Sequence, residues 1–177
     1  MEPQDDQVAG EVLRGRGWRK AFTVTEMVGQ WASLVETVEN GYEDFIDEYT
    51  NDLYCRNWLH EAWVLLPGHV LVTWNQRIQE LDDRFRVATV FDDGQALSQF
   101  HWISRFDPGD MWWWRRHPRN LVGDLGRALR SAGAVDAPSD AHGRAPVASR
   151  TPFSASGTIG SAPANASRWP FGVAVAP

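Results

Sequence analysis

Apolar residues recur every three or four positions along much of the chain, and this spacing constrains the fold more than any other feature. The clearest series steps by three and four from end to end: Leu71, Trp74, Ile78, Leu81, Phe85 and Ala88. An earlier series keeps the same spacing: Val28, Trp31, Val35, Val38, Tyr42, Phe45 and Tyr49. Such spacing places apolar side chains on one face of an α-helix and predicts amphipathic helices that pack against one another.

The first predicted helix starts near Thr23 or Thr25, since either side chain can cap it. The pair Asn40-Gly41 interrupts the helix, and such a pair often ends one. Because the apolar series keeps its phase across the pair, we expect one long, bent helix that reaches Tyr49. Two consecutive helices are the alternative.

Three further helices follow in the prediction. Thr50 or Asn51 is the expected cap of a second helix, which carries apolar side chains on half of its surface and ends at Pro67-Gly68. The third helix covers 71–88, and a short fourth helix covers 121–131. The second helix has an apolar face wide enough to pack against two neighbours.

The composition predicts one folded domain between two tails. The 177 residues include ten Trp, eight Phe and three Tyr, which can bury a sizeable core. From residue 134 onward Ala, Pro, Ser and Gly dominate and no acid follows Asp140, which predicts a disordered tail over 134–177. We expect a mobile arm over 1–22 and an all-α domain over 23–133, folded as an antiparallel three- to four-helix bundle.

Charge and cysteine content narrow the function classes. A formal net charge of -6 disfavours general affinity for nucleic acid phosphates. A single cysteine, Cys55, excludes an internal disulfide and fits a reducing compartment. The acidic start of the chain does not resemble a secretory signal, and no apolar run approaches the ~20 residues of a transmembrane helix. We therefore expect a cytoplasmic protein without a membrane partner.

Acidic residues are concentrated between Glu26 and Glu61, where nine Asp and Glu side chains accompany one arginine. Carboxylates on facing helices can bind metal ions when Glu-x-x-His motifs add ligands, but the sequence has no such motif. His60-Glu61 also lacks the second histidine of a zinc-protease helix. We predict a solvated acidic face with no metal and no cofactor, whose candidate partner-binding residues are Glu43, Asp47 and Glu48.

Arg56 and His60 lie four residues apart on the polar side of the second predicted helix. If this helix folds back along the first, Arg56 can form an ion pair with one of the three acids of the acidic face. The favoured interpretation is such a structural pair. The alternative is that Arg56 and His60 contact an anion or a partner protein.

The segment Met111–Arg116 contains three consecutive tryptophans followed by two arginines. Three adjacent indoles cannot all be hidden by one shallow contact, because neighbouring side chains point in different directions. Burial between other elements is the favoured interpretation, and the alternatives are a protein interface or stacking on nucleobases. The candidate residues for binding are Trp113, Arg115 and Arg116.

Four short segments carry a resemblance to a known group of proteins: Gly41-Tyr42, Tyr49–Leu53, Leu81–Phe85 and Trp112–Arg116. They are similar to segments of small helical proteins from high-GC actinobacteria, over roughly residues 25–130. The resemblance implies a soluble all-α domain and brings no known activity or site residue with it.

The sequence contains no P-loop, no dinucleotide-binding glycine motif and no Gly-x-Ser-x-Gly elbow. We therefore predict a non-enzymatic interaction protein of the immunity, antitoxin or adaptor type, whose acidic face binds the basic surface of another protein. One alternative is a small hydrolase that uses carboxylates and His60, with or without a metal ion. The other is a regulator that binds nucleic acid through its Trp/Arg segment.

Overall fold

The computed structural model describes residues 3–100 and 111–135, and most of this part of the chain is helical, as predicted. Its elements are the α-helices α1 (Pro3–Gly15), α2 (Val24–Asn40), α3 (Ile46–Trp63), α4 (Gly68–Ala88), α5 (Gln95–Ser98) and α6 (Gly123–Ser131), the 3-10 helix η2 (Trp112–Arg115), and the strands β1 (Thr89–Phe91) and β2 (Arg116–Pro118).

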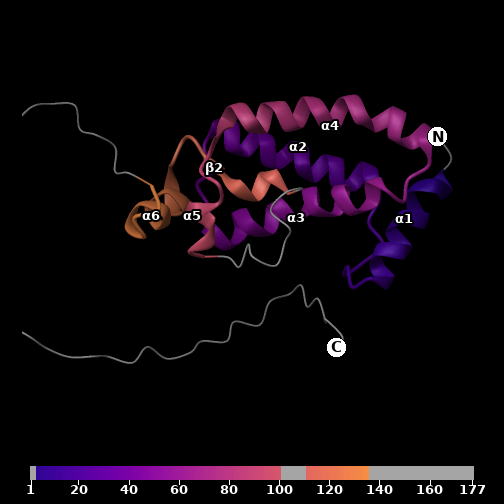
Figure 1. The fold of residues 1–177 in the computed structure, drawn as a ribbon, viewed down its shortest axis with the longest axis horizontal. Helices are drawn as coiled ribbons and strands as arrows, with labels where there is room; N and C mark the ends of the chain where they lie inside the picture. The colour runs from indigo at the N-terminus through magenta and orange to yellow at the C-terminus, as the bar shows by residue number, and fades with distance from the viewer. Residues whose placement is uncertain (1–2, 101–110, 136–177) are drawn as a thin grey trace, which may run out of the picture.

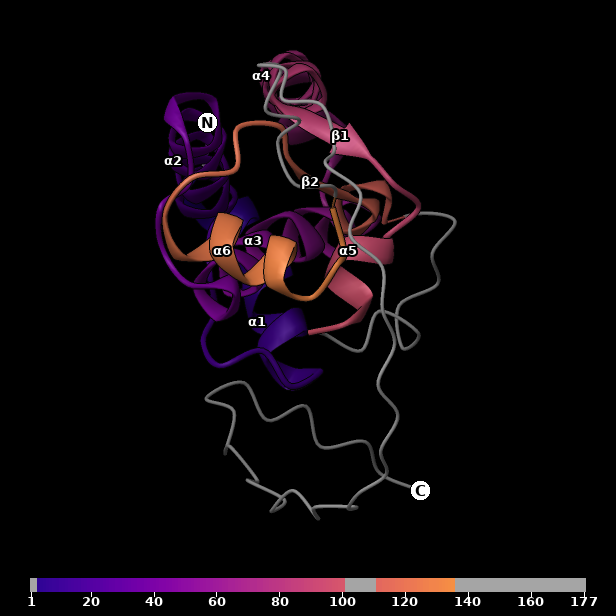
Figure 2. The ribbon, with the colours of Figure 1, turned by 90° about the vertical axis from the view of Figure 1, so that its left-hand side faces the viewer.

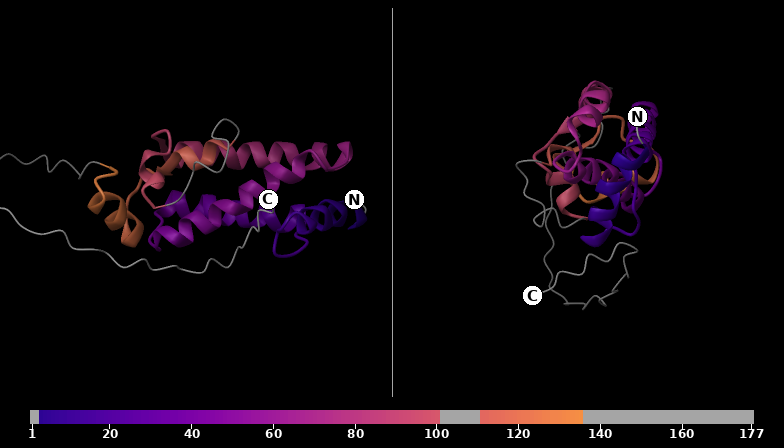
Figure 3. Two further views of the ribbon diagram at one scale, coloured as in Figure 1. Left: turned by 60° about the horizontal axis from the view of Figure 1, so that its bottom comes forward. Right: turned by 90° about the vertical axis from the view of Figure 1, so that its right-hand side faces the viewer.

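Three long helices, α2, α3 and α4, lie lengthwise in the molecule (Figure 1, Figure 3). Only the short connections 41–45 and 64–67 join them, so consecutive helices run in opposite directions. The helix α2 packs against both α3 and α4. Figure 2 shows the three helices nearly end-on, with α6 in front of them. Their fully buried side chains form the core and include Trp31, Tyr49, Leu53, Trp58, Leu81 and Phe85.

The capping residue of α2 and the extent of α4 agree with the sequence. The Thr23 hydroxyl accepts a hydrogen bond from the Glu26 backbone N–H at 3.2 Å, which satisfies one free donor at the start of α2. The third predicted helix is α4, which starts slightly earlier than expected, directly after Pro67. None of the described helices combines the length and the apolarity that a membrane crossing requires.

The prediction of one long, bent helix is wrong, because α2 ends at Asn40 and α3 begins only at Ile46. Gly41 has a φ of 104°, which a glycine adopts without strain and which takes the chain out of the helix. The alternative of two consecutive helices is therefore correct. The predicted cap at Thr50 or Asn51 is also wrong, because α3 runs through both residues.

The prediction of a mobile arm over residues 1–22 is wrong for the described part of this range. Residues Pro3–Gly15 form α1, and Ala9 and Leu13 on it are buried in the core. At Gly10 the helix lies so close to the following segment that a Cβ atom would be 2.2 Å from the Phe22 carbonyl oxygen. Two core residues in α1 are too few to produce a visible helical period in the sequence. The helix is therefore recognised only from its packing against the rest of the domain.

A small two-stranded antiparallel sheet, which the sequence did not predict, closes the domain beyond α4. The strand β1 pairs with β2 in the register Thr89↔Pro118, Val90↔His117 and Phe91↔Arg116. Strands of three residues are too short for alternation of polar and apolar residues to identify them. The predicted tail from residue 134 lies outside the described residues, apart from Ala134 and Val135, which pack against the core.

Candidate functional site

The predicted acidic residues gather at the start of α3 and in the connection that precedes it. Glu43, Asp47 and Glu48 are all exposed. Asp44 and Asp52 lie beside them and are exposed as well. We call these five residues the acidic patch. In the described part of the chain no Lys, Arg or His forms an ion pair with any of them.

The carboxylates of the acidic patch act on one another. Asp52 is exposed as a residue, but partial burial of its carboxylate raises the pKa, and the negative charges of Glu48 and Asp44 raise it further. The Tyr42 hydroxyl donates a hydrogen bond of 2.8 Å to Asp52 and opposes this shift without cancelling it. Burial and the nearby Asp52 charge raise the pKa of Tyr42, so its phenol stays protonated and remains a donor.

The backbone beneath the acidic patch is held by α6. The backbone N–H groups of Asp124 and Leu125 donate to the carbonyl oxygens of Glu43 and Asp44, at 2.8 and 2.9 Å. Gly123 has a φ of 56°, and a Cβ atom there would lie 2.0 Å from the Glu43 carbonyl oxygen. Only glycine allows this approach, so the start of α6 fixes the loop that presents the acidic side chains.

Replacing Asp52 by asparagine is expected to stabilise the folded protein at pH 7, by no more than about 1 kcal/mol because solvent screens part of the charge. The folded-state pKa of Asp52 lies above its ordinary value of 3.8. Its favourable contribution is therefore complete below 3.8 and is lost as the pH rises through the folded-state pKa. Asparagine removes the charge and keeps an acceptor for Tyr42.

The measurement for Asp52→Asn is urea denaturation of both proteins between pH 3 and pH 7. The stability difference should shrink as the pH falls and the wild-type carboxyl becomes protonated. A variant that is less stable than the wild type at pH 7 would contradict this account of the acidic patch.

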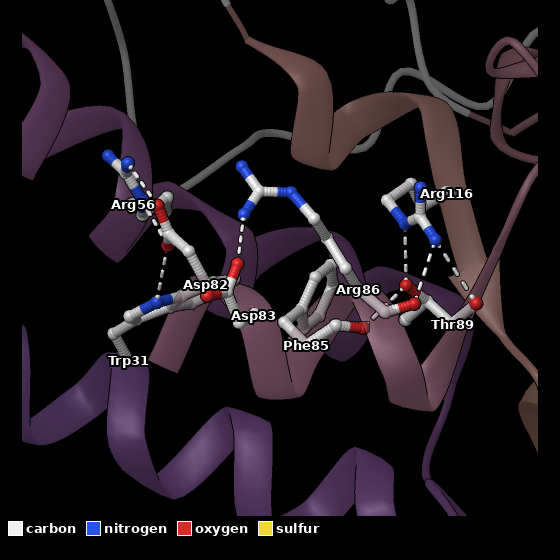
Figure 4. A network of polar contacts seen from close by, with 8 residues as sticks. All are labelled: Trp31, Arg56, Asp82, Asp83, Phe85, Arg86, Thr89 and Arg116. Carbon is white, nitrogen blue, oxygen red and sulfur yellow. Dashed lines mark hydrogen bonds and ion pairs between the residues drawn. The ribbon is translucent and has the colours of Figure 1, made fainter. Parts of the chain in front are cut away.

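The prediction that Arg56 pairs with Glu43, Asp47 or Glu48 is wrong. Arg56 Nε and Nη2 donate to Asp82 Oδ1 and Oδ2 at 2.9 and 2.8 Å. The Trp31 indole N–H also donates to Asp82 Oδ1, at 3.0 Å (Figure 4). The side chains of Arg56 and Asp82 are only 13% and 8% exposed, so their ion pair joins α3 to α4 inside the domain. The Trp31 hydrogen bond adds α2 to this connection.

The sequence does contain a signal for this ion pair. Asp82 lies four residues after Ile78 and three before Phe85, so it occupies the apolar face of α4. A carboxylate at such a position needs a buried partner, because an unpaired charge there is costly.

The Trp segment is mostly internal, in agreement with the favoured interpretation. The indole N–H groups of Trp113 and Trp114 both donate to Asn57 Oδ1, at 2.7 and 2.8 Å, and both side chains are 1% exposed. Arg115 forms an ion pair with Asp93 at 3.1 Å. Trp113 is therefore not available as a surface contact.

Arg116 is occupied by the backbone and side chain of neighbouring elements. It donates to Thr89 Oγ1 at 2.7 Å, to the Arg86 carbonyl at 2.8 Å and to the Thr89 carbonyl at 3.2 Å (Figure 4). These bonds connect β2 to the end of α4 and give Arg116 a structural role.

The predicted site residues thus lie in separate places. Glu43, Asp47 and Glu48 come together in the acidic patch, whereas Arg56 and His60 line a pocket between α3 and α4. Within the described ranges, no group of three or more His, Cys, Asp or Glu side chains is placed to hold a metal ion.

Comparison of the chain with protein-family models, with curated proteins and with solved structures gave no match. The resemblance to actinobacterial helical proteins therefore stays a prediction.

Proposed function

We propose that this protein is a non-enzymatic interaction protein, of the immunity, antitoxin or adaptor type, whose acidic patch binds the basic surface of another protein. The antiparallel helical bundle serves as the scaffold that presents the patch. One observation carries the proposal: five exposed carboxylates cluster without an ion-pair partner in the described chain. Partial burial raises the pKa of Asp52, and the negative charges of Glu48 and Asp44 raise it further.

A cluster of this kind costs stability in the free protein, and a basic partner would relieve the repulsion. Natural proteins often accept such a cost where a surface serves binding. Complementary charge also accelerates association and selects among partners, more than it raises affinity. The fixed backbone of the loop at Glu43 and Asp44 supports the proposal further, because little order must be gained on binding.

The structure supports the two alternatives, a nucleic-acid-binding regulator and a hydrolase, less well than it supports an interaction protein. The Trp/Arg segment would have to leave the interior to stack on nucleobases. A hydrolase that uses His60 would need a carboxylate beside the imidazole, and no hydrogen bond or ion pair connects His60 to an acid of the described chain.

The test is a double charge reversal, Glu43→Lys with Glu48→Lys, in the full chain used as bait in cells of the source organism. We expect a specific basic protein to be recovered with the wild type and to be reduced at least tenfold with the variant, because the attraction becomes a repulsion. Recovery with the wild type should also fall as the salt concentration rises.

The matched control is Glu11→Lys with Glu80→Lys, which changes the net charge equally at exposed positions outside the acidic patch. This control should recover the partner as the wild type does. Equal recovery with both double variants, or recovery of nothing beyond an empty-bait control, would overturn the proposal.

A further inference from the structure

A pocket of about 540 Å³ lies between the second half of α3 and one face of α4. Small-molecule sites in proteins have volumes of roughly 300–1,000 Å³, so the pocket is large enough for a metabolite. On α3 the pocket lies at His60. Because an α-helix rises 1.5 Å per residue, His60 is about 18 Å along the helix from Glu48. The pocket is therefore separate from the acidic patch.

Two arginines on the pocket wall are held rigidly by tryptophan rings. The Arg56 guanidinium lies 4.6 Å from the centroid of the Trp113 ring, and the Arg86 guanidinium lies 4.0 Å from that of Trp112. A guanidinium has about five N–H donors. The structure engages two of them in Arg56, at Nε and Nη2, and the Arg86 side chain donates through Nη1 to Asp83 at 2.7 Å.

His60 adds uncommitted donor and acceptor atoms to the same wall. Its ring packs edge-on against Trp113, with centroids 5.7 Å apart, and neither ring nitrogen has a hydrogen-bond partner in the described chain. Both nitrogens are thus available to a ligand.

The two acids of the pocket do not make it negative. Asp82 accepts three hydrogen bonds and is neutralised by Arg56, and Asp83 forms an ion pair with Arg86. Figure 4 shows the Arg56 and Arg86 guanidinium groups on the same side of α4, with both carboxylates between them. Both guanidinium groups keep N–H donors that these pairs do not engage, and such charged donors form strong hydrogen bonds with an anion.

Part of the remaining lining is apolar and flat, beside the polar side chains of Asn75 and Gln79. Leu59 and Trp63 contribute from α3, and Ile78 contributes from α4. A pocket with one apolar wall and a few convergent polar groups suits a ligand that has a flat body and one charged end.

We propose that this pocket binds a small molecule that carries an anionic group, a carboxylate or a phosphate, on a flat apolar body. The anionic group contacts Arg86 and His60, and the flat body lies against Trp63 and Ile78. The Arg56–Asp82 pair forms the rigid floor that keeps the polar wall in place.

The test is isothermal titration of the full chain with three probes: 2-naphthoate for the carboxylate, adenosine 5′-monophosphate for the phosphate, and the neutral 2-naphthamide. At least one anionic probe should bind with a Kd of about 1 mM or tighter. Naphthamide should bind at least about tenfold more weakly, since it has no negative charge and cannot form an ion pair with a guanidinium. The better anionic probe distinguishes a carboxylate ligand from a phosphate ligand.

Variants then locate the binding site. His60→Ala and Arg86→Gln should each raise the Kd of the probe about fivefold or more, because each removes a hydrogen-bonding group. Gln79→Trp should block binding, because Gln79 is exposed and lines the pocket, so an indole ring there fills it. Arg77→Gln, an exposed arginine of the same helix outside the pocket, should leave binding unchanged. Circular dichroism checks that each variant is folded.

Three results would overturn this proposal: no binding of either anionic probe, equal binding of the neutral probe, or unchanged binding in both His60→Ala and Arg86→Gln. Because none of these variants alters the acidic patch, such a failure would leave the proposed protein–protein interaction standing.

Discussion

Replacing Asp82 by alanine is expected to lower the free energy of unfolding by about 3–5 kcal/mol, the usual cost of removing one partner from a buried ion pair. The change leaves the Arg56 guanidinium without its two bonds to the carboxylate, and it removes the acceptor of the Trp31 indole N–H. Urea denaturation followed by circular dichroism measures the loss.

The neighbouring residue provides a matched control for Asp82→Ala. The Asp83 side chain is 76% exposed in its ion pair with Arg86, so Asp83→Ala should cost less than about 1 kcal/mol. Equal stability of Asp82→Ala and Asp83→Ala would show that the buried Arg56–Asp82 ion pair does not stabilise the domain.

A second variant separates the charge effect from the loss of packing. In Arg56→Met with Asp82→Leu both charges are absent, and apolar replacements of buried ion pairs are often neutral or stabilising by about 1–4 kcal/mol. We expect this double variant to be more stable than Asp82→Ala. The unpaired Trp31 indole N–H should retain a cost of about 1–3 kcal/mol.

Replacing Asn57 by leucine is expected to cost about 2–6 kcal/mol, because two buried donors lose their shared acceptor at about 1–3 kcal/mol each. The indole N–H groups of Trp113 and Trp114 both depend on Asn57 Oδ1, and both rings are in the core. The near-ultraviolet circular dichroism signal of tryptophan should weaken together with the stability, since η2 would lose two hydrogen bonds to α3 that orient its indole rings.

Asn40→Leu is the control for this substitution. Asn40 is exposed in the last turn of α2 and donates to the Glu36 carbonyl, so its replacement should change stability by less than about 1 kcal/mol. An unchanged tryptophan signal in Asn57→Leu would show that the two indoles do not need this acceptor.

The fold was predictable where a pattern is local and long. The series from Leu71 to Ala88 identified α4, and Thr23 identified the start of α2, because helical spacing and capping are properties of neighbouring residues. The break after Asn40 was misjudged because it is held by α6, far away in the sequence. A pattern carried across Gly41 contains no information about that contact.

The candidate site was predictable to the same extent. Glu43, Asp47 and Glu48 are close in sequence, and their exposure followed from the local concentration of charge. The partner of Arg56 was missed because Asp82 comes from another helix, where the aspartate on the apolar face was the available signal. The pocket could not be predicted, because His60 and Arg86 meet only after α3 and α4 have packed.

The contacts between α6 and the loop at Glu43 and Asp44 also determine when the complete acidic patch can form during synthesis. The residues that hold this loop, Gly123 to Leu125, are among the last of the domain to leave the ribosome. Contacts between residues this distant in sequence form late, because the closure of a long loop must come first. An incomplete chain therefore carries the five acids but lacks the fixed loop, so a partner that requires the fixed loop would bind only finished copies of the protein.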